Sequence, residues 1–533
     1  EAGGVVRRAG TAAELRDLKP QDVLVLAEAP CLSEGELANV RAHLKRGGGL
    51  VANWAVGARD AECAWRGWEA VAELTGAEDV REIPSREALF LTVPAGVSLS
   101  PGIDPGTRIE LRPDPSLALR VSGAKVYWSD WALNPAPDES GGGADAAALA
   151  AHSPHGGRVT WFGFRLSQVA THTDSLRVAR LVRNGLWWSA GVPLAAPAPW
   201  PEARRAALVF ALDVEDESQN ALAVADMFRR RQVLGSFYAV SQLVRDDEEL
   251  ATWLEIGGEV GSQTSDHTPV AGLTAQEQML RLQRSWTEIA EWTGHAPLGL
   301  HPPEERFDAN TLSAWAAAGG TYLLGSNEAR SGSPELHGPP SDRLVLLPRL
   351  LRDDYNILVQ DRVVRASRLR QAFLEDLRKF RAIGGLAVVA THTQIMRPGP
   401  RLDALGAVVD SARTQPGWWI ARGGDVADWW SARAEVGLRF AAPESVEHPE
   451  LAASGVSDLL VTAPSDRGVE GLWIDVVYSG ARLDVTPLVD GQPVDFAATE
   501  WGLRVPVTDL PAGATRRIAF VIRPENRAAW PTS

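Results

Sequence analysis

The segment FALDVEDE, residues 210–217, ends an apolar strand and runs directly into a cluster of acidic residues. The acids that follow the strand are Asp213, Glu215, Asp216 and Glu217. In α/β folds the active site is built at the carboxyl ends of the strands, where these side chains would lie. A solvated surface loop has the same composition. The segment therefore predicts an α/β sheet and identifies one candidate site at its edge.

Three other apolar strands in the same part of the chain also end in polar side chains. They lie in the segments GGEVGSQTSDH (257–267), LGLHPPEE (298–305) and LAVVATHTQ (386–394). His267, His301 and His392 each follow one of these strands. Because parallel strands end at one edge of their sheet, we expect the three imidazoles to meet the acids there. Carboxylates with imidazoles suit Zn²⁺ or a related divalent ion, and a further acid and histidine suit proton transfer.

The composition is that of an ordinary globular protein. The chain has 533 residues, of which 45% are hydrophobic and 23% charged, enough for about three domains with separate cores. The formal net charge of −15 argues against a nucleic-acid partner, because such proteins bind phosphates through cationic side chains. No apolar run approaches the ~18 residues that span a membrane. Nothing in the sequence specifies an oligomeric state.

Two changes of pattern divide the chain. The proline-rich segment PLAAPAPWP, residues 193–201, predicts a linker between an N-terminal block and the middle block. The N-terminal block alternates strands with helices, beginning with VLVL at 23–26, and this order predicts a parallel α/β sheet. After about residue 435 the helical patterns stop. Short alternating segments such as LWIDVVY (472–478) then predict a small antiparallel β-sandwich.

The two cysteines and two of the tryptophans each allow two structural interpretations. Cys31 and Cys63 are either one disulfide or two small buried residues. The chain begins at Glu1 and not at methionine, as expected for a processed protein whose signal peptide has been removed. We therefore expect a secreted, periplasmic or cell-surface location. Among the twenty tryptophans, Trp473 and Trp501 are either sugar-stacking residues or, as we favour, core residues.

The middle block resembles the NodB-homology polysaccharide deacetylases. The resemblance rests on the four strand-end segments, on VLGSFYAV (233–240) and on GWWIARGGDVADWW (417–430). It implies a distorted (β/α) barrel that uses a divalent metal, most often Zn²⁺, to hydrolyse acetyl groups on sugars. By the same resemblance Asp213 is the catalytic base and His392 the acid that protonates the leaving group. Glu215 and His267 are implied metal ligands, with Asp216 as a substitute for Glu215.

Two residues depart from the family pattern. Gln263 takes the place of the first metal-binding histidine, and an amide oxygen is a poor zinc ligand beside imidazole. His301 takes the place of the arginine that orients the base, so it either contacts Asp213 or supplies a metal nitrogen. Arg349 or Arg352, in LPRLLRDDY (347–355), could replace the lost cation. We count His301 with the catalytic residues and Gln263 with the metal ligands. The predicted substrate-binding residues are Pro302, Pro303 and Arg349.

The N-terminal block is similar to the class I glutamine amidotransferase-like fold. The similar segments are VLVLAEAP (23–30), GGGLVANW (47–54) and GRVTWFGF (157–164). The segment after the second strand, AVGARD, contains no cysteine nucleophile, so we expect no amidotransferase activity. Three histidines of the block are predicted to be surface or structural residues: His152, His155 and His172. We expect the block to bind or to act as a scaffold that shapes the sugar cleft from one side.

The sequence therefore predicts a multidomain α/β plus β protein. The predicted domains are a doubly wound α/β domain over 1–195, a distorted (β/α) barrel over 200–433 and a β-sandwich over 434–533. The first functional hypothesis is a metal-dependent deacetylase acting on an extracellular or cell-wall polysaccharide. The second is a catalytically lapsed relative that binds a glycan. Retention of Asp213, Glu215, His267 and His392 favours the first hypothesis, and Gln263 favours the second.

Overall fold

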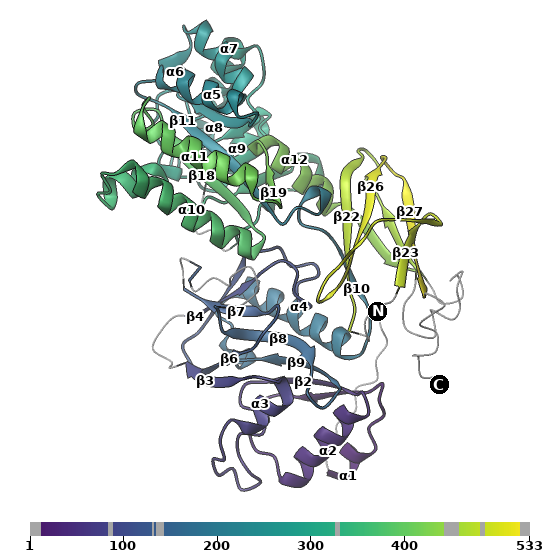
Figure 1. The fold of residues 1–533 in the computed structure, drawn as a ribbon. Helices are drawn as coiled ribbons and strands as arrows, with labels where there is room; N and C mark the ends of the chain where they lie inside the picture. The colour runs from purple at the N-terminus through teal and green to yellow at the C-terminus, as the bar shows by residue number, and fades with distance from the viewer. Residues whose placement is uncertain are drawn as a thin grey trace.

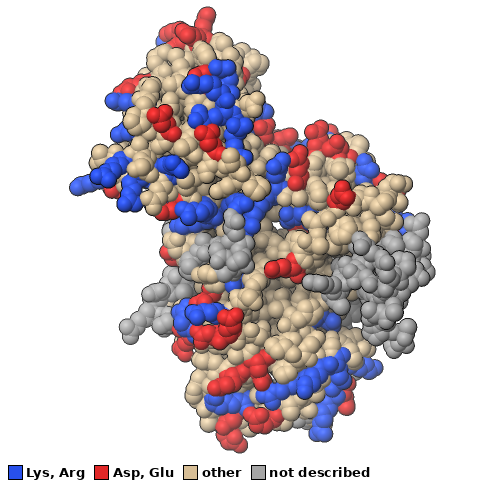
Figure 2. Space-filling view, viewed as in Figure 1, with Lys and Arg blue, Asp and Glu red and all other residues tan. Residues whose placement is uncertain are grey.

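The computed structural model describes residues 12–83, 89–130, 133–134, 143–325, 331–441, 458–479 and 485–522. It contains an N-terminal sheet, a central sheet surrounded by helices and a C-terminal pair of sheets (Figure 1). Acidic and basic side chains are interspersed over the face shown in Figure 2. None of the described helices is both long enough and apolar enough to cross a bilayer.

The N-terminal sheet is parallel only at one end. The parallel strands are β1 (Val23–Leu26), β2 (Gly49–Asn53) and β9 (Arg158–Phe162). The antiparallel strands are β3 (Asp79–Ile83), β4 (Leu89–Val93), β5 (Thr107–Leu111), β6 (Ser116–Arg120), β7 (Val126–Ser129) and β8 (Ala146–His152). The prediction of a parallel sheet is thus wrong for this part. The reason is local, since β8 and β9 are joined by only five residues, which permit a hairpin and no crossover.

Helices cover both faces of the parallel part. The short helix α1 (Ala12–Arg16) precedes β1, and α2 (Glu34–Lys45) and α3 (Glu69–Thr75) pack with one face of the sheet. The long helix α4 (His172–Ser189) packs on the other face (Figure 1). Helix α2 begins at a capping box, in which Ser33 and Glu36 satisfy two free amides.

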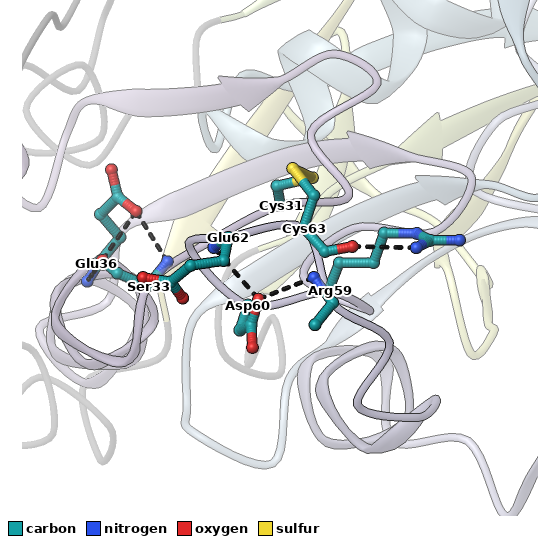
Figure 3. Close-up of a disulfide and its surroundings, with 8 residues drawn as sticks. Cys31, Ser33, Glu36, Arg59, Asp60, Glu62 and Cys63 are labelled. Atoms are coloured by element: carbon teal, nitrogen blue, oxygen red, sulfur yellow. Dashed lines mark hydrogen bonds between the residues drawn. A yellow bond between two sulfur atoms is a disulfide. The ribbon is translucent and has the colours of Figure 1, made fainter.

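A disulfide links the loop that follows β1 to the loop that follows β2. Cys31 and Cys63 are bonded, with their Cα atoms 5.1 Å apart (Figure 3). Arg59 Nη1 donates to the carbonyl of Cys63 at 2.9 Å, and Asp60 Oδ1 accepts from the amides of Glu62 and Ala64. Of the two states that the sequence left open for this cysteine pair, the structure therefore contains the bonded one.

The central sheet is mostly parallel and has no closed ring of hydrogen bonds among the described residues, so the predicted barrel is not confirmed. Its parallel strands, in spatial order, are β17 (Leu344–Leu347), β15 (Tyr322–Leu324), β14 (Gly299–Leu300), β13 (Gly258–Ser262), β12 (Gly235–Ala239), β11 (Ala206–Val214) and β18 (Leu386–His392). The edge strand β16 (Glu335–His337) pairs antiparallel with β17, and β19 (Trp418–Ile420) pairs with the amino-terminal half of β11. Within the described ranges, no ladder joins β17 to β18 or β19.

Apolar helix faces pack against this sheet. The helices are α5 (Asn220–Arg230), α6 (Ser241–Val244), α7 (Glu248–Gly257), α8 (Ala275–Thr293), α9 (Ala309–Ala318), α10 (Ala366–Ile383), α11 (Pro400–Thr414) and α12 (Gly423–Ala434). Helix α8 begins at a Thr274–Glu277 capping box and ends at Gly294 in the left-handed conformation. Helix α10 buries Leu369 and Phe373 against the sheet through its helical repeat.

The C-terminal region consists of two antiparallel sheets. One contains β10 (Leu194–Pro197), β22 (Val469–Val477), β26 (Gly502–Leu510) and β25 (Ala497–Ala498). The other contains β20 (Gly437–Phe440), β21 (Leu459–Thr462), β27 (Thr515–Ile522), β23 (Val485–Val489) and β24 (Gln492–Pro493). The two sheets share one apolar cluster, to which each contributes strand residues.

The predicted linker at residues 193–201 is wrong in part, because it contains strand β10. Residues 194–197 lie in the proline-rich segment, yet they pair antiparallel with β22. Proline is compatible with this position because β10 is an edge strand with an unpaired side. The segment between the first two predicted domains is therefore part of the third.

The N-terminal region contacts the central sheet at the end away from the candidate site. The amide of Ala95 donates to the carbonyl of Ile383 at 2.8 Å, just before the first residue of β18, whereas His392 is the last. The expectation that this region shapes a sugar cleft is therefore not supported. Trp501 is 8% exposed and packs with Trp188 in a cluster between the N- and C-terminal regions, so it is a core residue.

Candidate active site

The carboxyl ends of four central strands bring the predicted side chains together. Asp213 is the penultimate residue of β11 and is the register partner of His392 at the end of β18. The amide of Gln263, just after β13, donates to Ala239 of β12, and the amide of His301 donates to Ser262 of β13. The residues thus lie at the ends of β14, β13, β11 and β18, with β12 between β13 and β11 in the sheet.

Asp213 lies between two histidines. Its side chain is only 3% exposed, and Oδ1 lies 2.7 Å from Nδ1 of His301. Its second oxygen, Oδ2, lies 3.5 Å from Nε2 of His392. Burial lowers the pKa of His301, but the charge of Asp213 and the hydrogen bond to it more than compensate and raise the pKa to about 9. His301 is therefore a cation beside Asp213 at neutral pH.

His392 is oriented by a carboxylate that sequence reasoning missed. Asp354 Oδ1 lies 2.7 Å from Nδ1 of His392, and Asp354 Oδ2 accepts from the backbone amide of the same histidine at 3.0 Å. Burial lowers the pKa of His392, whereas the hydrogen bond to Asp354 and the charge of Asp213 raise it to about 10 overall. The signal in the sequence is the Asp pair of LPRLLRDDY, which follows strand β17.

Glu215 accepts from three side chains. Its Oε1 lies 2.9 Å from Nε2 of His267 and accepts from Nε2 of Gln263 at 2.8 Å. Its Oε2 accepts from Nε2 of Gln394 at 2.6 Å, a contact with no equivalent among the predicted residues. Burial raises the pKa of Glu215, but the hydrogen bond and charge of His267 lower it to about 2 overall. Glu215 is therefore ionised at neutral pH.

The predicted substrate-binding residues do not line an open surface. Pro302 and Pro303 are buried. Arg349 is 14% exposed and is engaged by Glu305 and by Asp353. The sequence reasoning also proposed Arg352 as a substitute cation, but this side chain pairs with Asp376 on α10 instead. His301 itself is the cation that contacts Asp213.

Two groups of donor atoms could hold a divalent ion, and both include Glu215. In the first, one ligand atom each from Asp213, Glu215 and His392 lies within 4.8 Å of the others. In the second, His267 and Gln263 surround Glu215, and the buried Oε1 of Gln263 has no hydrogen-bond partner within the described part of the chain. Rotating the Gln263 amide by 180° would bring this oxygen to face the Glu215 carboxylate. Two acceptor oxygens in such a position repel each other, so the arrangement is favourable only with a cation between them. Asp216 is exposed and belongs to neither group. The carboxylates and imidazoles of both sets are ligands that suit Zn²⁺ or a related ion, and the amide oxygen of Gln263 is the weakest donor among them.

The acid Glu305 makes the stability of this site depend on pH. Burial raises the pKa of Glu305, but the hydrogen bond to His301 and the charge of Arg349 lower it to about 2, against 4.5 for an unperturbed glutamate. This difference corresponds to roughly 3 kcal/mol of folding stability. We expect Glu305→Gln to lower the free energy of unfolding of the central domain by about this amount at pH 7.

The sign of the effect follows from the lowered pKa. The stabilisation is complete above about pH 4.5, where both states are ionised, and is lost as the pH falls toward 2. The free energies of unfolding of wild type and Glu305→Gln, measured by denaturant titration, should therefore converge in acid. A difference between these two free energies that stays constant from pH 7 to pH 3 would contradict the lowered pKa of Glu305.

Comparison with known proteins gives a family match over part of the central domain, which includes Asp213, Glu215 and His301 but not His392. No curated protein matches the chain by sequence. A solved structure of a putative polysaccharide deacetylase from Mycobacterium smegmatis is 19% identical, with a TM-score of 0.40, and covers 44% of this chain and 92% of its own. The structure of Puue allantoinase is 16% identical, with a TM-score of 0.39, and covers 44% of this chain and 93% of its own. A carbohydrate esterase family 4 pseudoenzyme from Bacillus anthracis is 12% identical, with a TM-score of 0.31 and coverages of 42% and 66%. Residues 202–323 match the family model for polysaccharide deacetylase.

Proposed function

We propose that the central domain is a hydrolase that removes acetyl groups from an extracellular or cell-wall polysaccharide. The observation that carries the proposal is the placement of the buried Asp213 between His301 and His392. The other ring nitrogen of each histidine faces a further carboxylate, which is Glu305 for His301 and Asp354 for His392. The family match to residues 202–323 supports the same chemistry. The Cys31–Cys63 disulfide supports a location outside the reducing cytoplasm.

Asp213 is the proposed base. One of its oxygens is occupied by His301, and the other faces His392. The contact with His301 orients the carboxylate, so that Asp213 can take a proton from the water that attacks the acetyl carbonyl. His301 thus replaces the arginine that the resemblance led us to expect.

His392 is the proposed acid. Its pKa of about 10 keeps it protonated at neutral pH, and Asp354 fixes the ring so that Nε2 faces Asp213 and the site. The proton on Nε2 can therefore pass to the nitrogen or oxygen of the sugar as the acetyl group leaves. The products are acetate and a free amino or hydroxyl group.

Of the two donor groups, we assign the second to the metal. Glu215, His267 and Gln263 would hold a divalent ion and leave Asp213 and His392 free for proton transfer. When bound, such an ion supplies Lewis-acid polarisation of the acetyl carbonyl and of water. Gln394 keeps the Glu215 carboxylate in place through its second oxygen.

The experiment is release of acetate from defined acetylated polymers by the Zn²⁺-loaded chain. We expect acetate from at least one of a poly-N-acetylhexosamine, peptidoglycan and an O-acetylated polysaccharide. The second candidate is a lapsed relative that binds a glycan, and the saturated hydrogen bonding of Glu215 favours it. Binding to a polymer with no acetate release would support that candidate. Hydrolysis of a small cyclic amide without acetate would contradict both.

A further inference from the structure

Seven ionisable side chains form a closed ring of neighbours at the candidate active site. In order around the ring they are Asp213, His301, Glu305, Arg349, Asp353, Asp354 and His392. Acids alternate with cations except at Asp353 and Asp354, which are adjacent in the chain. The proposed base and acid are therefore connected twice. One connection is the direct 3.5 Å contact, and the other runs through Arg349.

Arg349 links the two halves of this ring. Its Nε contacts Oε1 of Glu305, and the same Glu305 oxygen lies 3.5 Å from Nε2 of His301. On the other side its Nη1 lies 3.4 Å from Asp353 and donates to the carbonyl of Leu351 at 2.9 Å. These two contacts tie down the turn that carries Asp354. A single guanidinium thus contacts Glu305, which faces His301, and also the residue next to Asp354, which faces His392.

The ring is buried, so its charges act strongly on one another. The exposed fraction of its side chains ranges from 0% for Asp354 to 18% for Glu305, and solvent screening is weak at such positions. The backbone supports the same placement. Glu304 and Glu305 have φ of 55° and 53°, in the left-handed region that non-glycine residues rarely adopt. Strain of this kind persists where the surrounding structure holds a side chain in a required position.

We propose that Arg349 is a positioning residue that fixes both proton-transfer histidines at once. Through Glu305 it sets the ring of His301 against Asp213. Through the turn of Asp353 and Asp354 it sets the ring of His392. The inference rests on the proposed function for the roles of these histidines, whereas the ring itself rests on six side-chain contacts and on the adjacency of Asp353 and Asp354 in the chain. It also differs from the predicted role of Arg349 in binding substrate.

The test compares Arg349→Gln and Arg349→Lys with a matched control, Arg352→Lys. Arg352 lies three residues along the same turn and pairs with Asp376 outside the ring. We expect Arg349→Gln to lower kcat for acetate release by about 10- to 100-fold, the usual cost of removing an orienting partner. KM should stay within about twofold, because the side chain does not face substrate. Arg349→Lys should recover part of kcat, and Arg352→Lys should leave both constants unchanged.

Other outcomes would overturn the proposal. An unchanged kcat in folded Arg349→Gln would show that the ring has only a structural role. A raised KM with unchanged kcat would show that Arg349 contacts substrate. Where Arg349→Gln does not fold, the nearly isosteric Glu305→Gln takes its place, with the same expected loss of kcat.

A readout without turnover separates this inference from the proposed function. In histidine-labelled protein, the imidazole N–H signals of His301 and His392 report their hydrogen bonds to Asp213 and Asp354. We expect both signals to shift in Arg349→Gln and neither to shift in Arg352→Lys. If the wild type releases no acetate, the proposed function fails, and these spectra still decide whether Arg349 positions both rings. Unshifted signals in Arg349→Gln would contradict the inference.

Discussion

Replacing Asp213 with asparagine should lower kcat for acetate release by about 10²- to 10⁴-fold, the range that a general base contributes. The amide has the shape of the carboxylate but cannot accept a proton from water. It also removes the negative charge that faces His301 at 2.7 Å and His392 at 3.5 Å. Initial rates of acetate release, measured at equal concentrations of folded protein, give the comparison.

A matched substitution controls for the change of charge. Asp246 lies between α6 and α7 of the same domain, and its side chain is 94% exposed. Asp246→Asn removes the same charge from a solvated position, so we expect its kcat to equal that of the wild type. If Asp213→Asn keeps more than about a tenth of the wild-type kcat, Asp213 is not the base.

Replacing Glu215 with glutamine should remove tight binding of Zn²⁺. Glu215 is common to both donor groups and is the one anion in the group that we assign to the metal. Loss of an orienting partner alone costs 10- to 100-fold in metal affinity, so loss of a charged ligand should cost at least about 100-fold. Calorimetric titration of metal-free protein with Zn²⁺ measures the change.

Two histidine variants distinguish the donor groups. In the assigned group, His267→Gln weakens Zn²⁺ binding and His392→Gln leaves it nearly unchanged. The opposite result would place the ion among Asp213, Glu215 and His392 and would remove Asp213 and His392 from proton transfer. Wild-type affinity in Glu215→Gln would contradict both placements.

The positions of Asp213, His301 and His392 could be predicted because each lies at or just after the carboxyl end of a strand. Strand ends are visible in sequence as apolar runs that stop at polar residues, and the sheet topology brings such ends to one edge. Asp354 and Glu305 could not be predicted in the same way. They lie in short helical segments that no apolar periodicity marks in the sequence: Glu305 ends the 3₁₀ helix Pro303–Glu305, and Asp354 lies just before the π-helix Asn356–Gln360.

The fold, like the site, could be predicted only where the signal is local in the sequence. Capping boxes at Ser33 and Thr274 mark the starts of two helices, because the signal lies within four residues. Strand β10 lies in a segment that reads as a linker, because its partner β22 is nearly 280 residues further along the chain. The antiparallel part of the N-terminal sheet was missed for a related reason, since apolar strands look alike in sequence whichever way their neighbours run.

The most direct test of the account is a titration of metal-free protein with Zn²⁺ while acetate release from an acetylated polysaccharide is recorded. The account predicts that the rate rises in proportion to added metal and levels off at one equivalent per chain. It also predicts that Glu215→Gln shows no such rise. Full activity in the presence of a chelator, or no acetate at any metal concentration, would contradict a metal-dependent deacetylase.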